Sequence, residues 1–87
     1  MMDNTMLLDQ VLKNQFEQKE LVETLLDEVI TSLEKKGYNP INQVVGYLIS
    51  GDPAYISSYD GARGKICQVE RDEILEVLLT RFIEHVK

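Results

Sequence analysis

The sequence has few of the residues on which disulfide and metal chemistry depend. Its 87 residues include one cysteine, one histidine, two prolines and no tryptophan. A single cysteine, Cys67, cannot form a disulfide within the chain, and a zinc site would lack a second thiolate ligand. These absences exclude a disulfide-stabilised scaffold and indicate a reducing compartment.

Long apolar runs are also absent. No stretch approaches the roughly 20 apolar residues that a helix needs to cross a bilayer. The N-terminal residues lack the basic start and the apolar centre of a secretion signal. We therefore expect a cytoplasmic protein that does not insert into a membrane.

Basic residues are outnumbered by acidic ones. The chain has nine Lys and Arg against fifteen Asp and Glu, which gives a formal net charge of -6. A net negative charge repels the phosphate backbone of nucleic acids and anionic lipid surfaces. Nucleic acid is therefore an unfavourable partner, and we expect the partners to be proteins.

No set of residues is spaced for catalysis or for holding a cofactor or metal ion. His85 lies beside Glu84 near the C-terminus, with no Ser or Cys nucleophile placed by the sequence to use it. The adjacent carboxylates Asp72 and Glu73 would point about 100° apart on a helix and would not form an acid–base pair. The glycines match no phosphate-binding loop. We predict a non-enzymatic protein without a cofactor.

Two segments of the sequence have the apolar periodicity of an α-helix. From about Gln18 to Lys36, apolar residues recur at intervals of three and four, and the same pattern runs from about Glu70 to the C-terminus. No segment alternates apolar and polar residues between hairpin turns, as a half-buried strand would. The predicted fold class is all-α, a compact small domain of about four to five helices.

A proline marks the start of a central helix. Asn39 followed by Pro40 predicts an N-cap and a first helical residue, because proline has no N–H to leave unsatisfied there. The following residues, Ile41 to Ser50, are mostly apolar, and Gly51 is a typical helix stop. The sequence therefore predicts a short central helix between these signals.

Shorter elements are expected beyond the central helix. Asp52 and the proline after it repeat the start signal, which predicts a single turn over residues 53–56 before a loop at residues 57–61. Asp60 is predicted to cap a further short helix that ends near Gln68.

The chain divides into a tail and one helical domain. Residues 1–16 mix short apolar pieces with polar residues, and we predict a flexible N-terminal regulatory tail there, followed by a helical domain over residues 17–87. So short a domain buries little of its surface. Because the first and last helices carry broad apolar faces, we predict a homodimer that covers them.

Tyrosines and a local excess of basic residues mark candidate partner surfaces. Tyr38 and Tyr55, two of the four tyrosines in the middle of the chain, are assigned to a partner or dimer surface, with internal packing as the alternative. Arg63, Lys65 and Arg71 lie in the one stretch where basic residues outnumber acidic ones. They form a candidate site for a phosphate or an acidic partner, and a solvated helix face is the alternative.

Residues 36–56 carry a long and unusual motif, KGYNPINQVVGYLISGDPAYI. Together with Ala62-Arg63 and the run from Glu70 to Ile74, this motif resembles the IreB family over more than half of the chain. The resemblance implies a small helical homodimer in the cytoplasm of low-GC Gram-positive bacteria, without known catalysis. It also implies a substrate of a membrane Ser/Thr kinase with extracellular PASTA domains.

The resemblance implies a phosphoacceptor in the N-terminal tail. The family's acceptor is a threonine followed by an apolar residue, and Asn4-Thr5-Met6-Leu7-Leu8 is similar to that motif, so Thr5 is the expected phosphorylation site. Through this switch the family is understood to tune peptidoglycan synthesis, by affecting Clp-protease turnover of the enzyme that commits UDP-N-acetylglucosamine to the wall.

The sequence departs from the family pattern at three places. Leu8 stands where an aromatic residue is common, the tail is longer, and Ser57-Ser58-Tyr59 replaces a usually basic loop. A phosphate at Thr5 would add about -1.5 to -2 charges to an acidic segment. Two outcomes stay open: the tail is repelled from the acidic domain, or it docks on Arg63, Lys65 or Arg71. The rival function is a structural or assembly module in which Thr5 is incidental.

Overall fold

The chain is mostly helical in the part that the structure describes, which is residues 3–87 for the backbone and residues 17–87 for the side chains. In this computed structural model, these residues form four α-helices and two single 3₁₀ turns, and none of them is in a strand. The all-α prediction is confirmed. The elements are α1 (Asp3–Lys35), α2 (Pro40–Ser50), η1 (Pro53–Tyr55), η2 (Tyr59–Gly61), α3 (Ala62–Ile66) and α4 (Arg71–Val86).

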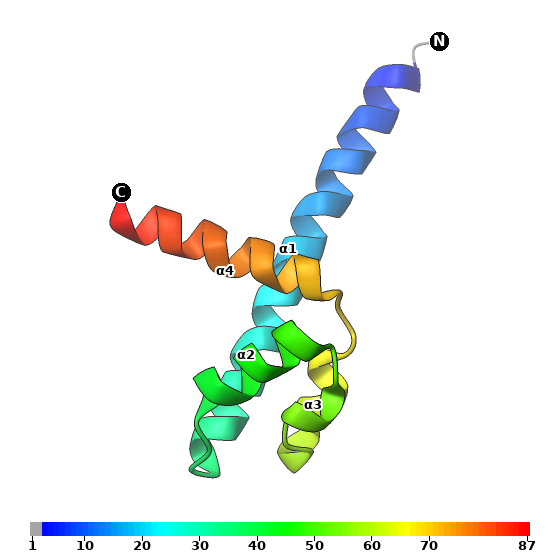
Figure 1. Ribbon diagram of the computed structural model, residues 1–87. Helices are drawn as coiled ribbons and strands as arrows, with labels where there is room; N and C mark the ends of the chain where they lie inside the picture. Colours follow the sequence, from blue (N-terminus) through cyan, green and yellow to red (C-terminus); the bar gives the residue numbers. More distant parts are fainter. Residues whose placement is uncertain (1–2) are drawn as a thin grey trace.

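The first helix, α1, is about 50 Å long at a rise of 1.5 Å per residue. It begins at Asp3, well before the predicted start near Gln18, in a segment without proline or glycine to end a helix. Its first turns extend beyond the other helices (Figure 1). A separate, flexible tail over residues 1–16 stays a prediction.

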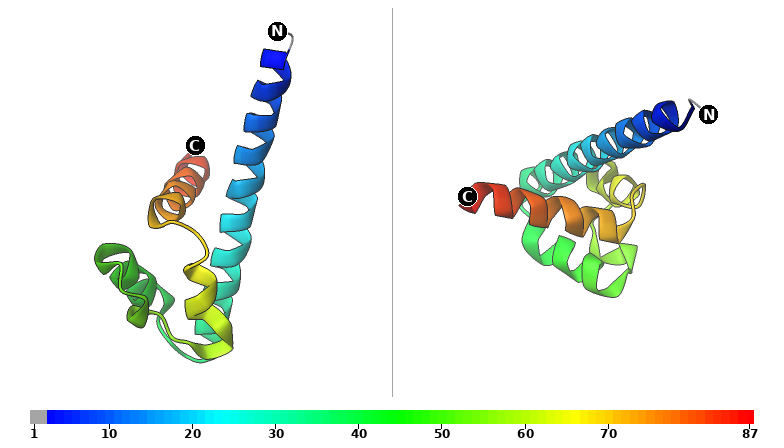
Figure 2. Two further views of the ribbon diagram at one scale, coloured as in Figure 1. Left: turned by 90° about the vertical axis from the view of Figure 1, so that its right-hand side faces the viewer. Right: turned by 90° about the horizontal axis from the view of Figure 1, so that it is seen from above.

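The core lies between the second half of α1 and the elements that follow it. The described side chains of α1 that are buried recur at helical spacing from Val22 onward, and α3 and α4 pack on them. Figure 2 shows α4 crossing α1, with α2 and α3 on the same side of α1. The apolar core residues are Val22, Leu25, Leu26, Val29, Leu33, Val44, Tyr47, Ile56, Ala62, Ile66, Val69, Ile74 and Val77.

The central helix α2 has the boundaries that its sequence signals predict. The Asn39 side chain accepts a hydrogen bond from the Asn42 N–H at 3.1 Å, and Pro40 is the first helical residue. At the other end, Gly51 takes a left-handed conformation (φ 75°), and its N–H donates to the Tyr47 carbonyl at 2.7 Å. The predicted cap, start and stop of this helix are confirmed.

The prediction that Asp60 caps a short helix is wrong. Asp60 lies inside η2 with φ 56°, and α3 begins only at Ala62, after Gly61. The Asp60 carboxylate instead accepts a hydrogen bond from the hydroxyl of Ser32 at 2.8 Å, and Ser32 is buried in α1. The contact with Ser32, and not helix capping, therefore determines how the Asp60 carboxylate is used. Asp60 adopts a left-handed backbone conformation there, which is unfavourable for a residue with a side chain.

The last helix, α4, begins at a reciprocal cap and is buried only near its start. The Glu70 N–H donates to the Glu73 carboxylate at 3.0 Å, and the Glu70 side chain accepts from the backbone at Glu73. Of the wide apolar face predicted for this helix, only Ile74 and Val77 are buried. No helix in the described part of the chain is long and apolar enough to cross a membrane.

Candidate functional site

The predicted phosphoacceptor lies at one end of the molecule. Thr5 belongs to the first turn of α1, and its side chain is outside the described ones.

The three basic residues of the predicted anion site have separate intramolecular partners. The Arg63 Nε donates to the Ile56 carbonyl at 2.9 Å. The Lys65 Nζ lies 3.4 Å from the Glu28 carboxylate on α1. Sequence reasoning missed these partners because they lie seven and 37 positions away. An anion would have to compete with these contacts for the same donors.

The third basic residue, Arg71, joins the start of α4 to the end of α2. One of its terminal nitrogens donates to the Leu48 carbonyl at 3.1 Å. The guanidinium lies so close to Gly51 that a Cβ there would be 2.8 Å from Arg71 Cζ. A positive charge beside the last carbonyls of a helix is favourable, because these groups carry partial negative charge.

The four tyrosines divide between the core and the surface. Tyr38 and Tyr55 are exposed, and the Tyr55 ring covers Gly46 on α2 so closely that a Cβ there would clash with it. Tyr47 is in the core, where burial raises the pKa of its phenol, with a smaller contribution from Cys67. The Lys36 ammonium lies 5.1 Å from the centre of the Tyr59 ring. Tyr38 and Tyr55 therefore lie at the surface, and their contact with a partner stays a prediction.

Two rows of exposed apolar side chains follow helical spacing. The α4 stripe consists of Leu75, Leu79, Phe82 and Val86, and the α2 stripe consists of Ile41, Val45 and Ile49. The helix α2 also contains no charged residue. Single exposed apolar residues are common, whereas rows of them at helical spacing are typical of surfaces that pair with another element. The stripe on α2 was missed because the sequence alone favoured burial of that helix.

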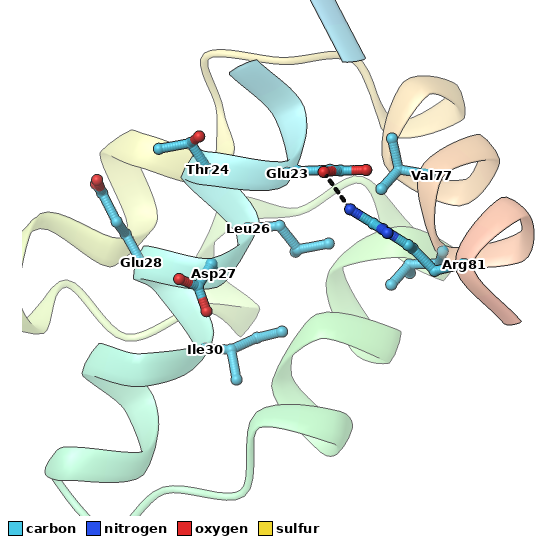
Figure 3. A pocket seen from close by; sticks show the side chains of 9 residues that line it. Glu23, Thr24, Leu26, Asp27, Glu28, Ile30, Val77 and Arg81 are labelled. Atoms are coloured by element: carbon cyan, nitrogen blue, oxygen red, sulfur yellow. Dashed lines mark hydrogen bonds and ion pairs between the residues drawn. The ribbon is translucent and has the colours of Figure 1, made fainter. Parts of the chain in front are cut away.

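A groove of about 520 Å³ runs between α1 and α4. Its floor is apolar, its α1 side is acidic, and the Arg81 guanidinium donates across it to the Glu23 carboxylate at 2.7 Å (Figure 3). This hydrogen bond raises the pKa of Arg81 above its ordinary value. We call this the α1–α4 groove, lined by Glu23, Thr24, Leu26, Asp27, Glu28, Ile30, Val77, Leu78 and Arg81.

The two most reactive side chains, Cys67 and His85, lie on different elements. Cys67 is exposed just after α3, and His85 is exposed in the last turn of α4. Among the residues described, no three His, Cys, Asp or Glu side chains are grouped to hold a metal ion. The described surface has apolar and charged areas that suit contacts with other macromolecules.

A comparison with known protein families assigns the chain. Residues 3–84, nearly its whole length, match the family described as IreB regulatory phosphoprotein. That description names a regulatory role and not an enzymatic one, and it includes phosphorylation. It agrees with an all-helical chain that carries unpartnered apolar rows. The chain belongs to the IreB family of regulatory phosphoproteins.

Proposed function

We propose that this protein is a cytoplasmic regulator controlled by phosphorylation of Thr5 and acting through contacts with other proteins. The phosphorylating enzyme would be a PASTA-domain Ser/Thr kinase, and the controlled process would be peptidoglycan synthesis, through Clp-protease turnover of its first committed enzyme. The single observation that carries the proposal is the family match over residues 3–84. The exposed apolar rows support action through protein contacts.

The proposal includes a homodimer built on the α4 stripe. Its four side chains lie between Leu75 and Val86, and most of the last helix is not covered by the side chains that the structure describes. A standard interface buries about 800 Å² per partner. The four side chains of the stripe are 51 to 62% exposed, so a second copy could cover them. The resulting pair would bury identical surfaces, as a twofold dimer does.

The length of α1 bears on how a phosphate on Thr5 could act. A continuous helix rises about 35 Å between residue 5 and residue 28, and Glu28 is the residue that Lys65 contacts. A phosphothreonine side chain spans only a few ångströms, so it would not reach Lys65 along an intact α1. Docking on Lys65 therefore requires unwinding of the first turns of α1 or a second chain.

The phosphorylation step is tested by mass spectrometry of the protein from its host. We expect phosphate on Thr5 when the kinase is active and its loss in Thr5→Ala, while Thr31→Ala, an exposed threonine of α1, stays phosphorylated. Capture of binding proteins by the unmodified and the phosphorylated chain should then give two different partner sets. An unmodified Thr5 in cells with active kinase would contradict the switch.

The rival function is an assembly module in which the dimer is the whole activity. The α4 stripe favours this reading as much as it favours a regulator, because both need self-association. The two functions separate in Thr5→Ala cells. A regulator loses control of peptidoglycan synthesis while its dimer persists, whereas an assembly module is unaffected.

A further inference from the structure

The α1–α4 groove combines an apolar floor with an acidic side. Leu26 and Val77 are each only 6% exposed and form the base, while Ile30 and Leu78 are partly open beside them. Apolar side chains from outside could reach this base without rearrangement of the core. A helix from another molecule fits such a site, because its apolar residues recur on one face.

The charges around the groove are unequal. Its lining holds three carboxylates, Glu23, Asp27 and Glu28, against the single guanidinium of Arg81. Glu23 is paired with Arg81, and Glu28 is paired with Lys65. Asp27 makes no ion pair with any side chain that the structure describes. Asp27 is therefore the carboxylate best able to accept a cation from a partner.

The chain's own exposed helical faces do not match this charge. The α4 stripe belongs to a helix with four acidic and two basic residues, and the α2 stripe belongs to a helix without any charge. A second copy that docked through either stripe would thus bring negative or uncharged surface to an acidic rim. Like charges brought together disfavour a complex, and opposite charges select a partner and speed its association.

We propose that the α1–α4 groove binds an amphipathic helix with basic flanks from another protein. The groove runs alongside α1 from Glu23 to Ile30, about 10 Å at 1.5 Å per residue, which is two turns. The bound helix presents apolar residues at spacings of three and four to Leu26 and Val77, and a Lys or Arg beside them pairs with Asp27. This inference rests on the proposed role as a protein-binding regulator, but it does not depend on phosphorylation of Thr5.

The test uses two designed peptides and the unmodified full-length protein. Both are 14-residue amphipathic helices with leucines on one face, and their flanks carry lysine in one peptide and glutamate in the other. We expect the lysine peptide to bind at least tenfold more tightly at low salt. The amide NMR shifts that this peptide causes in the protein should centre on residues 23–30 and on Val77, Leu78 and Arg81. Equal affinities, or shifts centred on the α2 or α4 stripe, would overturn the proposal.

Charge variants separate specific pairing from general attraction to an acidic protein. Asp27→Asn should weaken the lysine peptide about two- to fivefold, as an exposed ion pair does, with less effect at high salt. Glu34→Gln removes the same charge from α1 outside the groove and should leave the affinity unchanged. If both variants weaken binding equally, attraction is only general and the proposal fails.

Two further measurements assign the occupant. Thr5→Ala should bind the lysine peptide as the parent does, so that failure of the phosphorylation switch is distinguishable from failure of the groove. Protein titrated alone by NMR should show shifts on the α4 stripe and not in the groove. If self-association shifts residues 23–30 and competes with the peptide, the occupant is a second copy and the proposal is wrong.

Discussion

Truncation of Phe82 tests the proposed dimer most directly, because this ring is the largest member of the α4 stripe. It is 62% exposed, so its removal leaves no cavity in the monomer. An aromatic side chain buries about 200 Å² when fully covered. With 62% of this area exposed, about 120 Å² per chain can be covered by a partner. Alanine keeps about 40 Å² of it, so Phe82→Ala removes about 80 Å², or about 2 kcal/mol at 25 cal/mol per Å².

A symmetric dimer loses this contribution twice, because each copy presents the same side chain. The expected total is about 4 kcal/mol, which raises the dissociation constant about a thousandfold. Sedimentation equilibrium across a range of concentrations measures this constant, and circular dichroism verifies that the monomer keeps its helices. Ile49→Ala on the α2 stripe is the matched control, since Ile49 is 79% exposed and lies on another helix.

The result that would refute the reasoning is specific. If Phe82→Ala dimerises as the parent does and Ile49→Ala dissociates, the self-association surface is on α2 and the α4 stripe is open to other partners. If neither variant changes the mass of a dimeric parent, the interface lies elsewhere on the chain.

Three further predictions concern the folded chain itself. Asn39→Ala removes the acceptor at the start of α2 and should lower the free energy of unfolding by about 0.5 to 2 kcal/mol in a denaturant titration. Ser32→Ala should cost about 1 kcal/mol by the same assay, whereas Asp60→Asn, which retains an acceptor oxygen and tolerates a left-handed backbone, should cost less. Burial raises the pKa of Tyr47 above the ordinary value of 10.0 for a tyrosine, so the folded state favours the protonated phenol. That stabilisation is complete below this pH and is lost as the pH rises through the raised pKa; thermal unfolding between pH 9 and 12 should show a smaller decline for Tyr47→Phe.

The parts of the fold that were predictable depend on residues close in sequence. The boundaries of α2 follow from Asn39, Pro40 and Gly51, whose effects act within a few residues. The same reasoning from neighbouring residues gave a wrong prediction at Asp60. The Ser32 hydroxyl, which is 28 positions away, donates a hydrogen bond to the Asp60 carboxylate. A cap preference of about 1 kcal/mol is small enough for such a contact to override it.

The α1–α4 groove was not predictable from the sequence, because it depends on where two helices cross. Glu23 and Arg81 are 58 positions apart, and no local pattern pairs them. Periodicity predicted a wide apolar face on α4, but this pattern does not show which residues of the face pack against α1. Only the crossing buries Val77 and leaves Phe82 exposed.

The Arg71 side chain connects the two helices that carry the apolar stripes. It starts α4 and, through its contacts with Leu48 and Gly51, closes the end of α2. A force that swings α4 away would withdraw the guanidinium and release the last carbonyls of α2. By thermodynamic reciprocity, a partner that tightens α2 also resists displacement of α4. Arg71 therefore gives α2 and α4 a shared contact, so that a partner bound to one of these helices acts on a side chain that the other helix also uses.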